Sequence, residues 1–430
     1  MKSWLSLSIF CLVFSSSILA QKLVVVNGGL YGSSVDFANV GIYDPATEVY
    51  TSLDTIKTNS VQDILIEDGR YVYVAAQDSI VKIDLQTNQR IAAAQFGAPS
   101  TIHLTLADSK LLVGNWYGSS NNNLRVFDKN TLTYLDSIPE ITKPAKDMLV
   151  IGDDLYIVQN SANASYQDTL GYLAVVDLTT MSWLRNETLS TNGDEIGRLI
   201  NVGDTAIYTL NKTSNTISSY NVNTQAKSTV SSSVTLEYNF YGPTIFREGD
   251  YWMLPFNGGI GVFDIVNNTA IQTNIVSIPI GNGFGFAVDS VQNRIFVSLI
   301  EFGNQNLNKG IVYNFAGTPV DSFQVGYSPE VLDIVYDNIT TGLTTMVAQD
   351  VQNVITSIYP NPTTDFITVN TTTQPSALTL HDIQGKLVAA QSLDALSSTV
   401  DVRRLVNGSY ILTVWKADGK AIGSQMFVKQ

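Results

Sequence analysis

The sequence predicts an all-β fold, in which a seven-bladed β-propeller is followed by a small C-terminal β-sandwich. Three observations lead to this prediction: short alternating runs recur through most of the chain, a turn marker returns every 40 to 50 residues, and the last 77 residues hold seven further runs. Aromatic residues make up 10% of the 430 residues and charged residues only 14%. This balance is typical of proteins built from strands rich in β-branched and aromatic residues.

The N-terminal 20 residues predict a secretory signal peptide. Lys2 gives a basic start, residues 5–14 form an apolar core, and small residues lead to Ala20. Signal peptides have this layout, and we expect cleavage after Ala20. The alternative, a membrane-spanning helix, needs about 20 apolar residues. We expect no transmembrane segment in the mature chain.

Charge and cysteine content exclude several classes of function. The formal net charge is −14, and no cluster of Lys and Arg is large enough to neutralise several phosphates. Nucleic acid and anionic membranes are therefore not expected partners. The only cysteine, Cys11, lies in the signal segment, so the mature chain is expected to lack disulfides and cysteine metal sites. Lipid attachment at Cys11 is an alternative, but Phe10 stands where a small residue is expected.

Residues 61–96 show the repeating unit most clearly. They hold four runs with two-residue alternation, at 63–67, 71–76, 80–85 and 90–96. Short turns separate the runs, and Asp68-Gly69 has the composition of a tight hairpin. Because one four-stranded sheet cannot bury both of its faces alone, further units of the same kind are expected beside it.

The third strand of each unit ends in an aromatic or aliphatic residue followed by Asp or Asn. The seven pairs are Tyr43-Asp44, Ile83-Asp84, Phe127-Asp128, Val176-Asp177, Tyr220-Asn221, Phe263-Asp264 and Tyr313-Asn314. Their spacings of 40, 44, 49, 44, 43 and 50 residues match the period of propeller blades. We expect the side-chain oxygen of each Asp or Asn to bond to the backbone two residues on.

The two ends of the repeat region predict how the ring closes. The first unit has three strands, at 22–26, 40–43 and 49–53, whereas one extra strand at 331–336 follows the seventh unit. We expect the extra strand to complete the first blade, which removes a free sheet edge. A propeller over residues 21–338 follows, and the weakly periodic segment 339–353 is expected to be a linker.

The C-terminal domain, residues 354–430, is predicted to be a small β-sandwich. Its seven strand-like runs are 356–359, 366–369, 377–381, 387–390, 398–402, 409–416 and 425–428. Four segments, at 357–363, 380–386, 405–412 and 426–429, resemble the C-terminal sorting domain of type IX secretion cargo in Bacteroidetes. The residues that carry this resemblance are Tyr359, Pro360, Asn361, Pro362, Asp382, Gly385, Gly408 and Tyr410.

This resemblance implies recognition by the outer-membrane secretion machinery, followed by release or attachment at the cell surface. The chain departs from the family pattern at His381, where Tyr is more usual, and at Val406, where a shorter polar residue is common. An immunoglobulin-like binding module remains the alternative for this domain.

A ligand-binding face is predicted at the loops between second and third strands. Each second strand ends in a polar residue, expected to form a ring around one mouth of the propeller: Asn27, Gln77, Asn115, Asn160, Asn211, Asn257 and Glu301. The pattern of residues 71–77 and 80–84 resembles the bacterial surface propellers with YVTN repeats. A structural role for each amide in its turn is the alternative.

Four of these loops are long, and the aromatic residues in them are further candidates for ligand contact. The aromatic candidates are Tyr31, Trp116, Tyr117, Tyr166 and Phe302. Aromatic rings and amides together suit a glycan or a large planar ligand, although the rings can instead pack their own loops. The resemblance to surface propellers of Bacteroidetes adds a corrinoid as a candidate ligand, and a protein partner is also expected to fit.

No catalytic residue, metal or cofactor is predicted. His103 lies in an expected inner strand and His381 in the C-terminal domain, so neither a histidine-based triad nor a three-histidine metal site can form. A hydrolase or lyase is the rival function, favoured if Asp36, Asp168 and Glu301 converge in a pocket. An adhesive scaffold with a flat face is a further alternative. The sequence thus predicts a secreted or cell-surface binding protein.

Overall fold

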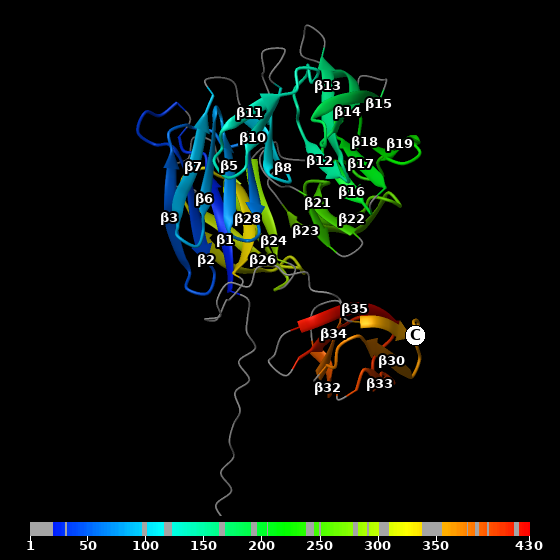
Figure 1. Cartoon of the computed structure of the whole chain (residues 1–430). Helices are drawn as coiled ribbons and strands as arrows, with labels where there is room; N and C mark the ends of the chain where they lie inside the picture. The colour runs from blue at the N-terminus through cyan, green and yellow to red at the C-terminus, as the bar shows by residue number, and fades with distance from the viewer. Residues whose placement is uncertain are drawn as a thin grey trace, which may run out of the picture. The chain divides into compact units, whose positions relative to one another are not determined.

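The computed structural model describes most of the chain as two compact units, divided between Ile339 and Thr340 (Figure 1). The described residues are 20–30, 32–96, 101–115, 123–162, 168–190, 196–203, 205–237, 245–248, 251–277, 283–289, 292–300, 309–337, 355–375, 377–382, 387–393, 395–416 and 421–430. They form 35 strands joined by turns and loops. Within these ranges there is no helix with the length and apolar character needed to cross a bilayer. The predicted signal and linker lie almost wholly outside them.

The first unit consists of seven four-stranded antiparallel sheets, as predicted for the seven blades. Blade one contains β1 (Ala20–Asn27), β2 (Ala38–Asp44), β3 (Val49–Ile56) and β28 (Pro329–Asp337), and blade two contains β4 (Asp63–Glu67), β5 (Tyr71–Ala76), β6 (Ser79–Asp84) and β7 (Gln89–Gln95). Blade three contains β8 (Thr101–Ala107), β9 (Lys110–Asn115), β10 (Leu124–Asp128) and β11 (Tyr134–Ser137), and blade four contains β12 (Met148–Ile151), β13 (Asp154–Ala162), β14 (Asp168–Asp177) and β15 (Ser182–Ser190). Blade five contains β16 (Leu199–Val202), β17 (Ala206–Asn211), β18 (Thr216–Asn221) and β19 (Lys227–Ser231). Blade six contains β20 (Phe246–Glu248), β21 (Tyr251–Phe256), β22 (Gly259–Asp264) and β23 (Thr269–Ser277), and blade seven contains β24 (Gly283–Asp289), β25 (Arg294–Ile300), β26 (Lys309–Asn314) and β27 (Pro319–Gln324).

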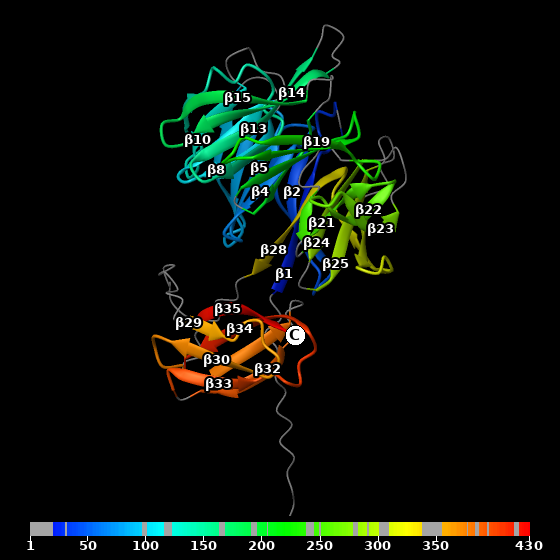
Figure 2. The same cartoon turned by 90° about the vertical axis from the view of Figure 1, so that its right-hand side faces the viewer.

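The ring closes through blade one, as the sequence predicts. Strand β28 pairs antiparallel with β1, in a register that places Leu23 opposite Ile334, and the sheet order is β28-β1-β2-β3. Figure 2 shows these two strands side by side, although more than 300 residues separate them in the sequence. Leu23, Val25 and Leu332 are fully or almost fully buried, so closing the ring also completes a hydrophobic core.

The Asp or Asn at the end of each third strand makes the predicted turn. In six blades its Oδ1 accepts a hydrogen bond from the backbone N–H two residues on, at 2.7 to 3.1 Å. In blade six the bond shifts by one residue, because Asp264 accepts from Asn267 at 2.9 Å. The prediction of seven third strands is confirmed at every marker.

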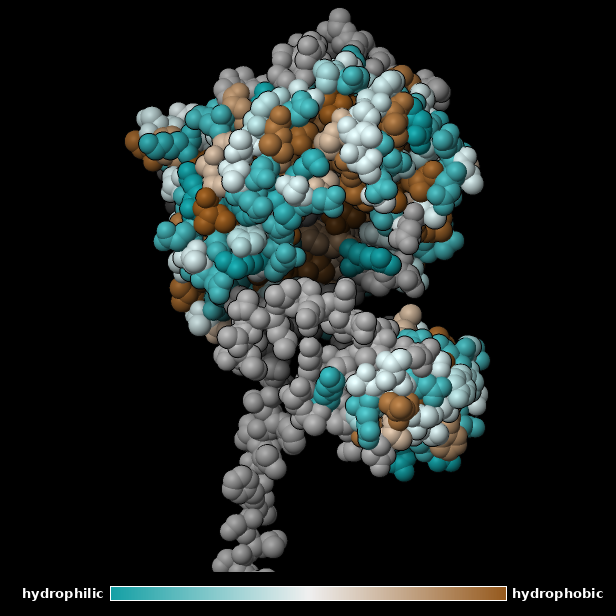
Figure 3. Space-filling view, viewed as in Figure 1, coloured by the Kyte–Doolittle hydropathy of each residue, from teal (hydrophilic) through white to brown (hydrophobic). Residues whose placement is uncertain are grey.

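Apolar side chains fill the seams between neighbouring sheets. In the seam between blades two and three, Tyr73, Leu111 and Phe127 are almost completely buried and pack against Ala94 and Phe96. Inner strands from several neighbouring blades also contact one another, in the order β24, β28, β4, β8, β12 and β16. Figure 3 shows that the apolar side chains left on the visible face form small patches between polar ones.

The second unit is the predicted small sandwich. One sheet has the order β29 (Ile355–Tyr359), β30 (Phe366–Thr371) and β33 (Ser397–Asp401), and the other has the order β32 (Leu387–Ser392), β31 (Ala377–Asp382), β34 (Gly408–Trp415) and β35 (Ala421–Lys429). Both sheets contribute to one core that includes Ile367, Leu380, Leu412 and Phe427. All seven predicted strands are confirmed.

Candidate functional site

Four of the predicted loop-face amides are buried, with exposed fractions of 0 to 4%: Asn27, Asn115, Asn160 and Asn211. The Nδ2 group of Asn27 donates to Asn39 Oδ1 at 2.9 Å and to the hydroxyl of Tyr50 at 2.8 Å. Asn160 both donates to and accepts from the backbone of Ile196, at 3.0 Å each. These four side chains lie inside the fold, and their contact with a ligand stays a prediction.

The other two described amides occupy hairpin turns. Gln77 and Asn257 have positive φ angles of 50° and 53°. The backbone N–H of Gln77 donates to Gln62 Oε1 at 2.7 Å, and Asn257 Oδ1 accepts from the N–H of Thr235 at 2.8 Å. Asn tolerates this left-handed geometry, and the hydrogen bonds give both residues a structural role. Their contact with a ligand stays a prediction.

The remaining loop-face candidates lie outside the described residues. They are Tyr31, Trp116, Tyr117, Tyr166, Glu301 and Phe302. The convergence of Asp36, Asp168 and Glu301 is therefore not tested.

A charged cluster joins blades two to five at the inner strands. His103 on β8 lies with Nδ1 2.9 Å from Asp63 Oδ2 and with Nε2 3.1 Å from Asp147 Oδ1. Each carboxylate also accepts a backbone N–H from the next blade, because Leu104 donates to Asp63 at 2.9 Å and Leu199 to Asp147 at 2.8 Å. Burial alone would lower the pKa of His103, but the two carboxylates outweigh it and raise that pKa.

Two further carboxyl groups lie on β28 near this cluster, of which Glu330 is buried and Asp333 is half-buried. Glu330 Oε2 accepts from the N–H of Val61 at 3.3 Å, and Glu330 Oε1 accepts from the hydroxyl of Ser328 at 2.9 Å. Burial raises the pKa of Glu330 to about 7. Burial, with a smaller effect of the Asp63 charge, raises the pKa of Asp333 to about 6.

The contacts of these inner groups indicate that they hold blades together. Asp63, Asp147 and Glu330 each accept a backbone N–H from the following blade or from the segment that leads into it. In the part of the chain that the structure describes, no three His, Cys, Asp or Glu residues are arranged to bind a metal ion. This cluster was not predicted from the sequence, although Asp63, His103 and Asp147 are 40 and 44 residues apart, which is the blade period.

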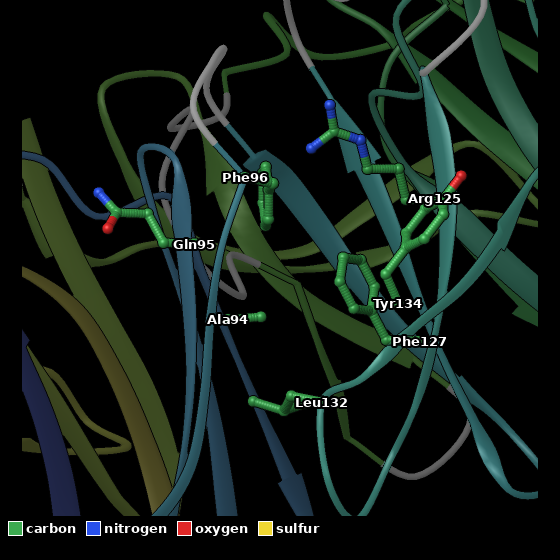
Figure 4. A pocket seen from close by; sticks show the side chains of 7 residues that line it. All are labelled: Ala94, Gln95, Phe96, Arg125, Phe127, Leu132 and Tyr134. Atoms are coloured by element: carbon green, nitrogen blue, oxygen red, sulfur yellow. The ribbon is translucent and has the colours of Figure 1, made fainter.

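An open pocket lies at the outer rim of the seam between blades two and three, and we call it the rim pocket (Figure 4). Its volume is about 350 Å³, and it is lined by Ala94, Gln95, Phe96, Arg125, Phe127, Leu132 and Tyr134. Strand β7 supplies Ala94, β10 supplies Arg125 and Phe127, and β11 supplies Tyr134. The side chains at residues 92 to 94 are all alanine, so the outer strand leaves space beside it.

Aromatic rings and one cation define the chemistry of the rim pocket. The guanidinium of Arg125 lies 4.4 Å from the centre of the Phe96 ring, and Phe127 packs edge-on against Tyr134 at 5.7 Å. Phe127 is 1% exposed and forms the floor, whereas Tyr134 is 52% exposed and stands at the mouth. Burial lowers the pKa of Arg125, although it stays charged at neutral pH.

The lining of the rim pocket suits binding better than acid–base catalysis. It contains no Asp, Glu or His, so it offers no pair of carboxylates for proton transfer. Aromatic faces bind apolar groups or sugar rings, and a guanidinium favours a negative group nearby. This site was not predicted from the sequence, in which three successive alanines in an outer strand are its local signal.

The sorting-motif residues tie together the two ends of the second unit. Asn361 Oδ1 accepts from the backbone N–H of Val428 at 2.8 Å, and Thr363 forms a parallel bridge with Lys429. The peptide bonds that precede Pro360 and Pro362 are cis. Tyr359 is 51% exposed, Asp382 ends β31, Gly408 begins β34, and Gly385 lies outside the described residues.

Tyr410 belongs to the core of the second unit. It is 3% exposed, stacks on Phe427 at 5.6 Å, and donates a hydrogen bond to the backbone oxygen of Val406 at 2.8 Å. The conformation of the chain before β34 is therefore linked to the sandwich core.

Comparison with protein families identifies the second unit. Residues 357–429 match the family model described as the secretion system C-terminal sorting domain. The chain is a β-propeller that carries a sorting domain. This domain directs the protein to secretion by the type IX system, or to a cell-surface location, and implies interaction with that machinery. No curated protein matches this chain.

Solved structures confirm the propeller fold of the first unit at low sequence identity. A Quinonprotein alcohol dehydrogenase-like protein from Bacteroides thetaiotaomicron is 13% identical, with a TM-score of 0.54 over 74% of this chain and 79% of that chain. A putative 6-phosphogluconolactonase from Bacteroides uniformis is 13% identical, with a TM-score of 0.51 over 74% and 100%. A functionally unknown protein from Desulfotomaculum acetoxidans is 12% identical, with a TM-score of 0.51 over 74% and 99%. At these identities the likeness shows the fold alone.

Proposed function

We propose that this protein is a secreted or cell-surface binding protein whose propeller captures an external ligand or partner in the rim pocket. The observation that carries this proposal is the combination of three aromatic rings with the Arg125 guanidinium in one open cavity. Such a lining favours a ligand that joins an apolar or ring-shaped group to a negatively charged group. The sorting domain supports an external ligand, because it carries the propeller out of the cell.

A binding role is favoured over the rival hydrolase or lyase. The rim pocket holds no carboxylate or imidazole. The described carboxylates at the inner strands, Asp63, Asp147 and Glu330, accept hydrogen bonds from protein groups that join blades. A general acid or base needs a position within reach of substrate, and these geometries do not favour one.

The finer assignments from the sequence are part of the same proposal. We propose a signal peptide at residues 1–20, a propeller at 21–338, a linker at 339–353 and a sorting domain at 354–430. The division of the chain near residue 339 and the family match from residue 357 support these bounds. We also propose a propeller of the YVTN type and an origin in Bacteroidetes, supported by the strand pattern of residues 71–84.

The proposal is tested by thermal stabilisation of the mature protein, residues 21–430, with glycans, corrinoids, haem and short peptides. A ligand that prefers the folded state raises the melting temperature. The expected result is a ligand that stabilises the wild type but not Tyr134→Ala. The control is Tyr251→Ala on β21, because Tyr251 is 38% exposed and lies in blade six.

If a ligand stabilises Tyr134→Ala and Tyr251→Ala equally, it binds elsewhere. This result would overturn the rim pocket as the binding site.

A further inference from the structure

A second pocket lies on the opposite side of strand β7 from the rim pocket. Its volume is about 360 Å³, and we call it the basic pocket because Lys57 and Arg90 line it. Its other lining residues are Thr55, Ile56, Ser79, Ile80, Val81, Ala93, Ala94 and Gln95. Ala94 and Gln95 are shared with the rim pocket, so the two cavities meet at β7.

Side chains along β7 alternate between the two faces of the sheet. Ala94 and Phe96 pack into the seam with blade three, whereas Ala93 lines only the basic pocket, toward blade one. Figure 4 shows Phe96 on one side of the strand and Gln95 on the other. This alternation is the ordinary two-residue period of a strand.

Strand β7 is the outer edge of blade two. Its sheet has the order β4-β5-β6-β7, so among the described strands only β6 pairs with it. An edge strand presents backbone N–H and C=O groups to which an extended chain can add. A strand added there would send successive side chains alternately to the rim pocket and to the basic pocket, because residues opposite one another share a face.

The two pockets differ in the side chain that each favours. The rim pocket offers the rings of Phe96, Phe127 and Tyr134, which suit an aromatic or large aliphatic side chain. The basic pocket offers two cations, which suit a carboxylate. Arg90 bonds to Asp54 at 2.6 Å but is 36% exposed, and no ion pair of Lys57 occurs among the described residues.

We propose that the propeller binds an extended peptide segment of a partner protein, which adds as a strand to the edge of β7 and alternates aromatic with acidic side chains. The aromatic side chains enter the rim pocket and the acidic ones the basic pocket. This inference rests on the proposed function, because it names the class of partner that the rim pocket takes.

The first test measures binding of a seven-residue peptide of alternating glutamate and phenylalanine to the mature protein by calorimetry. Two further peptides carry backbone N-methyl groups, one on the phenylalanines and one on the glutamates. In an added strand the N–H groups of alternate residues face the neighbouring strand. One methylated peptide is therefore expected to lose at least tenfold in affinity, while the other keeps its affinity. Equal binding of both methylated peptides and the parent would overturn strand addition.

The second test exchanges charges across the basic pocket. Arg90→Glu is expected to weaken the glutamate peptide about tenfold and to strengthen a peptide of alternating lysine and phenylalanine by a similar factor. Lys227→Glu on β19 is the matched control, since Lys227 is also 36% exposed and also pairs with a carboxylate, that of Glu187. The control is expected to leave both affinities unchanged.

Failures of the two proposals are distinguishable. If no peptide binds, but another ligand stabilises the wild type and not Tyr134→Ala, then the strand proposal is wrong and the binding function stands. A different outcome is that one methylated peptide loses affinity, as for an added strand, but neither Tyr134→Ala nor Arg90→Glu changes the affinity of the parent peptide. The peptide then binds at another sheet edge, and both proposals fail for β7.

Discussion

The two ends of the seam between blades two and three have opposite characters. At the inner end, His103 sits between two carboxylates, and Asp63 also accepts the backbone N–H of Leu104 across the seam. At the outer end, the same two blades leave a cavity of about 350 Å³ lined by rings and one guanidinium. The inner groups have their partners within the fold, whereas Tyr134 at the rim is half exposed.

The inner side chains have the shifted pKa values that reactive groups often show, whereas Tyr134 at the rim is exposed to a ligand. Buried histidines and carboxylates with shifted pKa values often mark active sites, but ion-pair networks that hold a structure together shift pKa values as well. Here the partners of the inner groups are backbone and side-chain atoms of neighbouring blades. Substitutions at the inner end should therefore alter stability, and substitutions at the rim should alter binding.

The largest expected effect is that of Asp63→Ala. Removing Asp63 takes away one of the two carboxylates that face His103 and leaves the N–H of Leu104 without its acceptor, which costs about 3 kcal/mol. Urea unfolding of the mature protein, followed by tryptophan fluorescence, measures this loss. Asp63→Asn keeps an acceptor for Leu104 and should lose less. Unchanged stability in Asp63→Ala would refute the structural role of the inner cluster.

The second prediction concerns the pH dependence of stability. Because burial raises the folded pKa of Glu330 to about 7, its favourable contribution is present below its unfolded pKa and is lost as pH rises through 7. Between pH 4 and pH 8 the wild type should lose up to about 3 kcal/mol from this group. Glu330→Gln should remove the pH-dependent loss that this group causes. The variant should therefore be more stable than the wild type at pH 8 and similar in stability at pH 4. A parallel decline in both proteins would contradict this prediction.

His103 contributes to the same decline with pH. Its folded pKa is raised by Asp63 and Asp147, so its stabilising charge is present below its unfolded pKa and is lost as pH rises through the folded value. The stability of Glu330→Gln should therefore still fall as pH rises, although less than that of the wild type.

The third prediction is a small loss of stability at the rim. Tyr134→Ala removes a ring that is already 52% exposed, and should cost about 1 kcal/mol. The same urea titration measures it, beside Asp63→Ala as the reference. A loss as large as that of Asp63→Ala would make the rim part of the structural core.

The smallest expected effect on stability is that of filling the rim pocket. Ala94→Leu should project into the pocket and change the free energy of unfolding by about 0.5 kcal/mol or less. It should nevertheless weaken binding of any ligand that occupies the pocket. Ala93→Leu, on the other face of β7, is the matched control for the rim pocket and should affect the basic pocket instead.

The fold could be predicted from the sequence because its signals are local. The Asp or Asn after each third strand makes a turn with its own backbone neighbours, so the marker identifies the blade wherever it occurs. The extra strand before residue 338 and the missing strand of blade one predict the ring closure without knowledge of any other contact. The seven strands of the sorting domain were predicted from short strand-like runs, which are also local.

The candidate site could not be predicted because it depends on side chains that meet across a seam. Phe96 and Tyr134 are 38 residues apart, and the alanines at 92–94 do not by themselves show which side chains meet beside them. The amides at strand ends make hydrogen bonds inside the fold, and their contact with a ligand stays a prediction. Asp63 and His103 are 40 residues apart, so the blade period relates their positions on the inner strands of neighbouring blades.

Hydrogen exchange on the mature protein, with and without the alternating glutamate–phenylalanine peptide, tests the central claim most directly. We expect added protection of backbone amides in β7, residues 89–95, and unchanged exchange in the inner strands β4 and β8. Protection confined to the inner strands, or to another blade, would contradict a binding site at the rim of this seam.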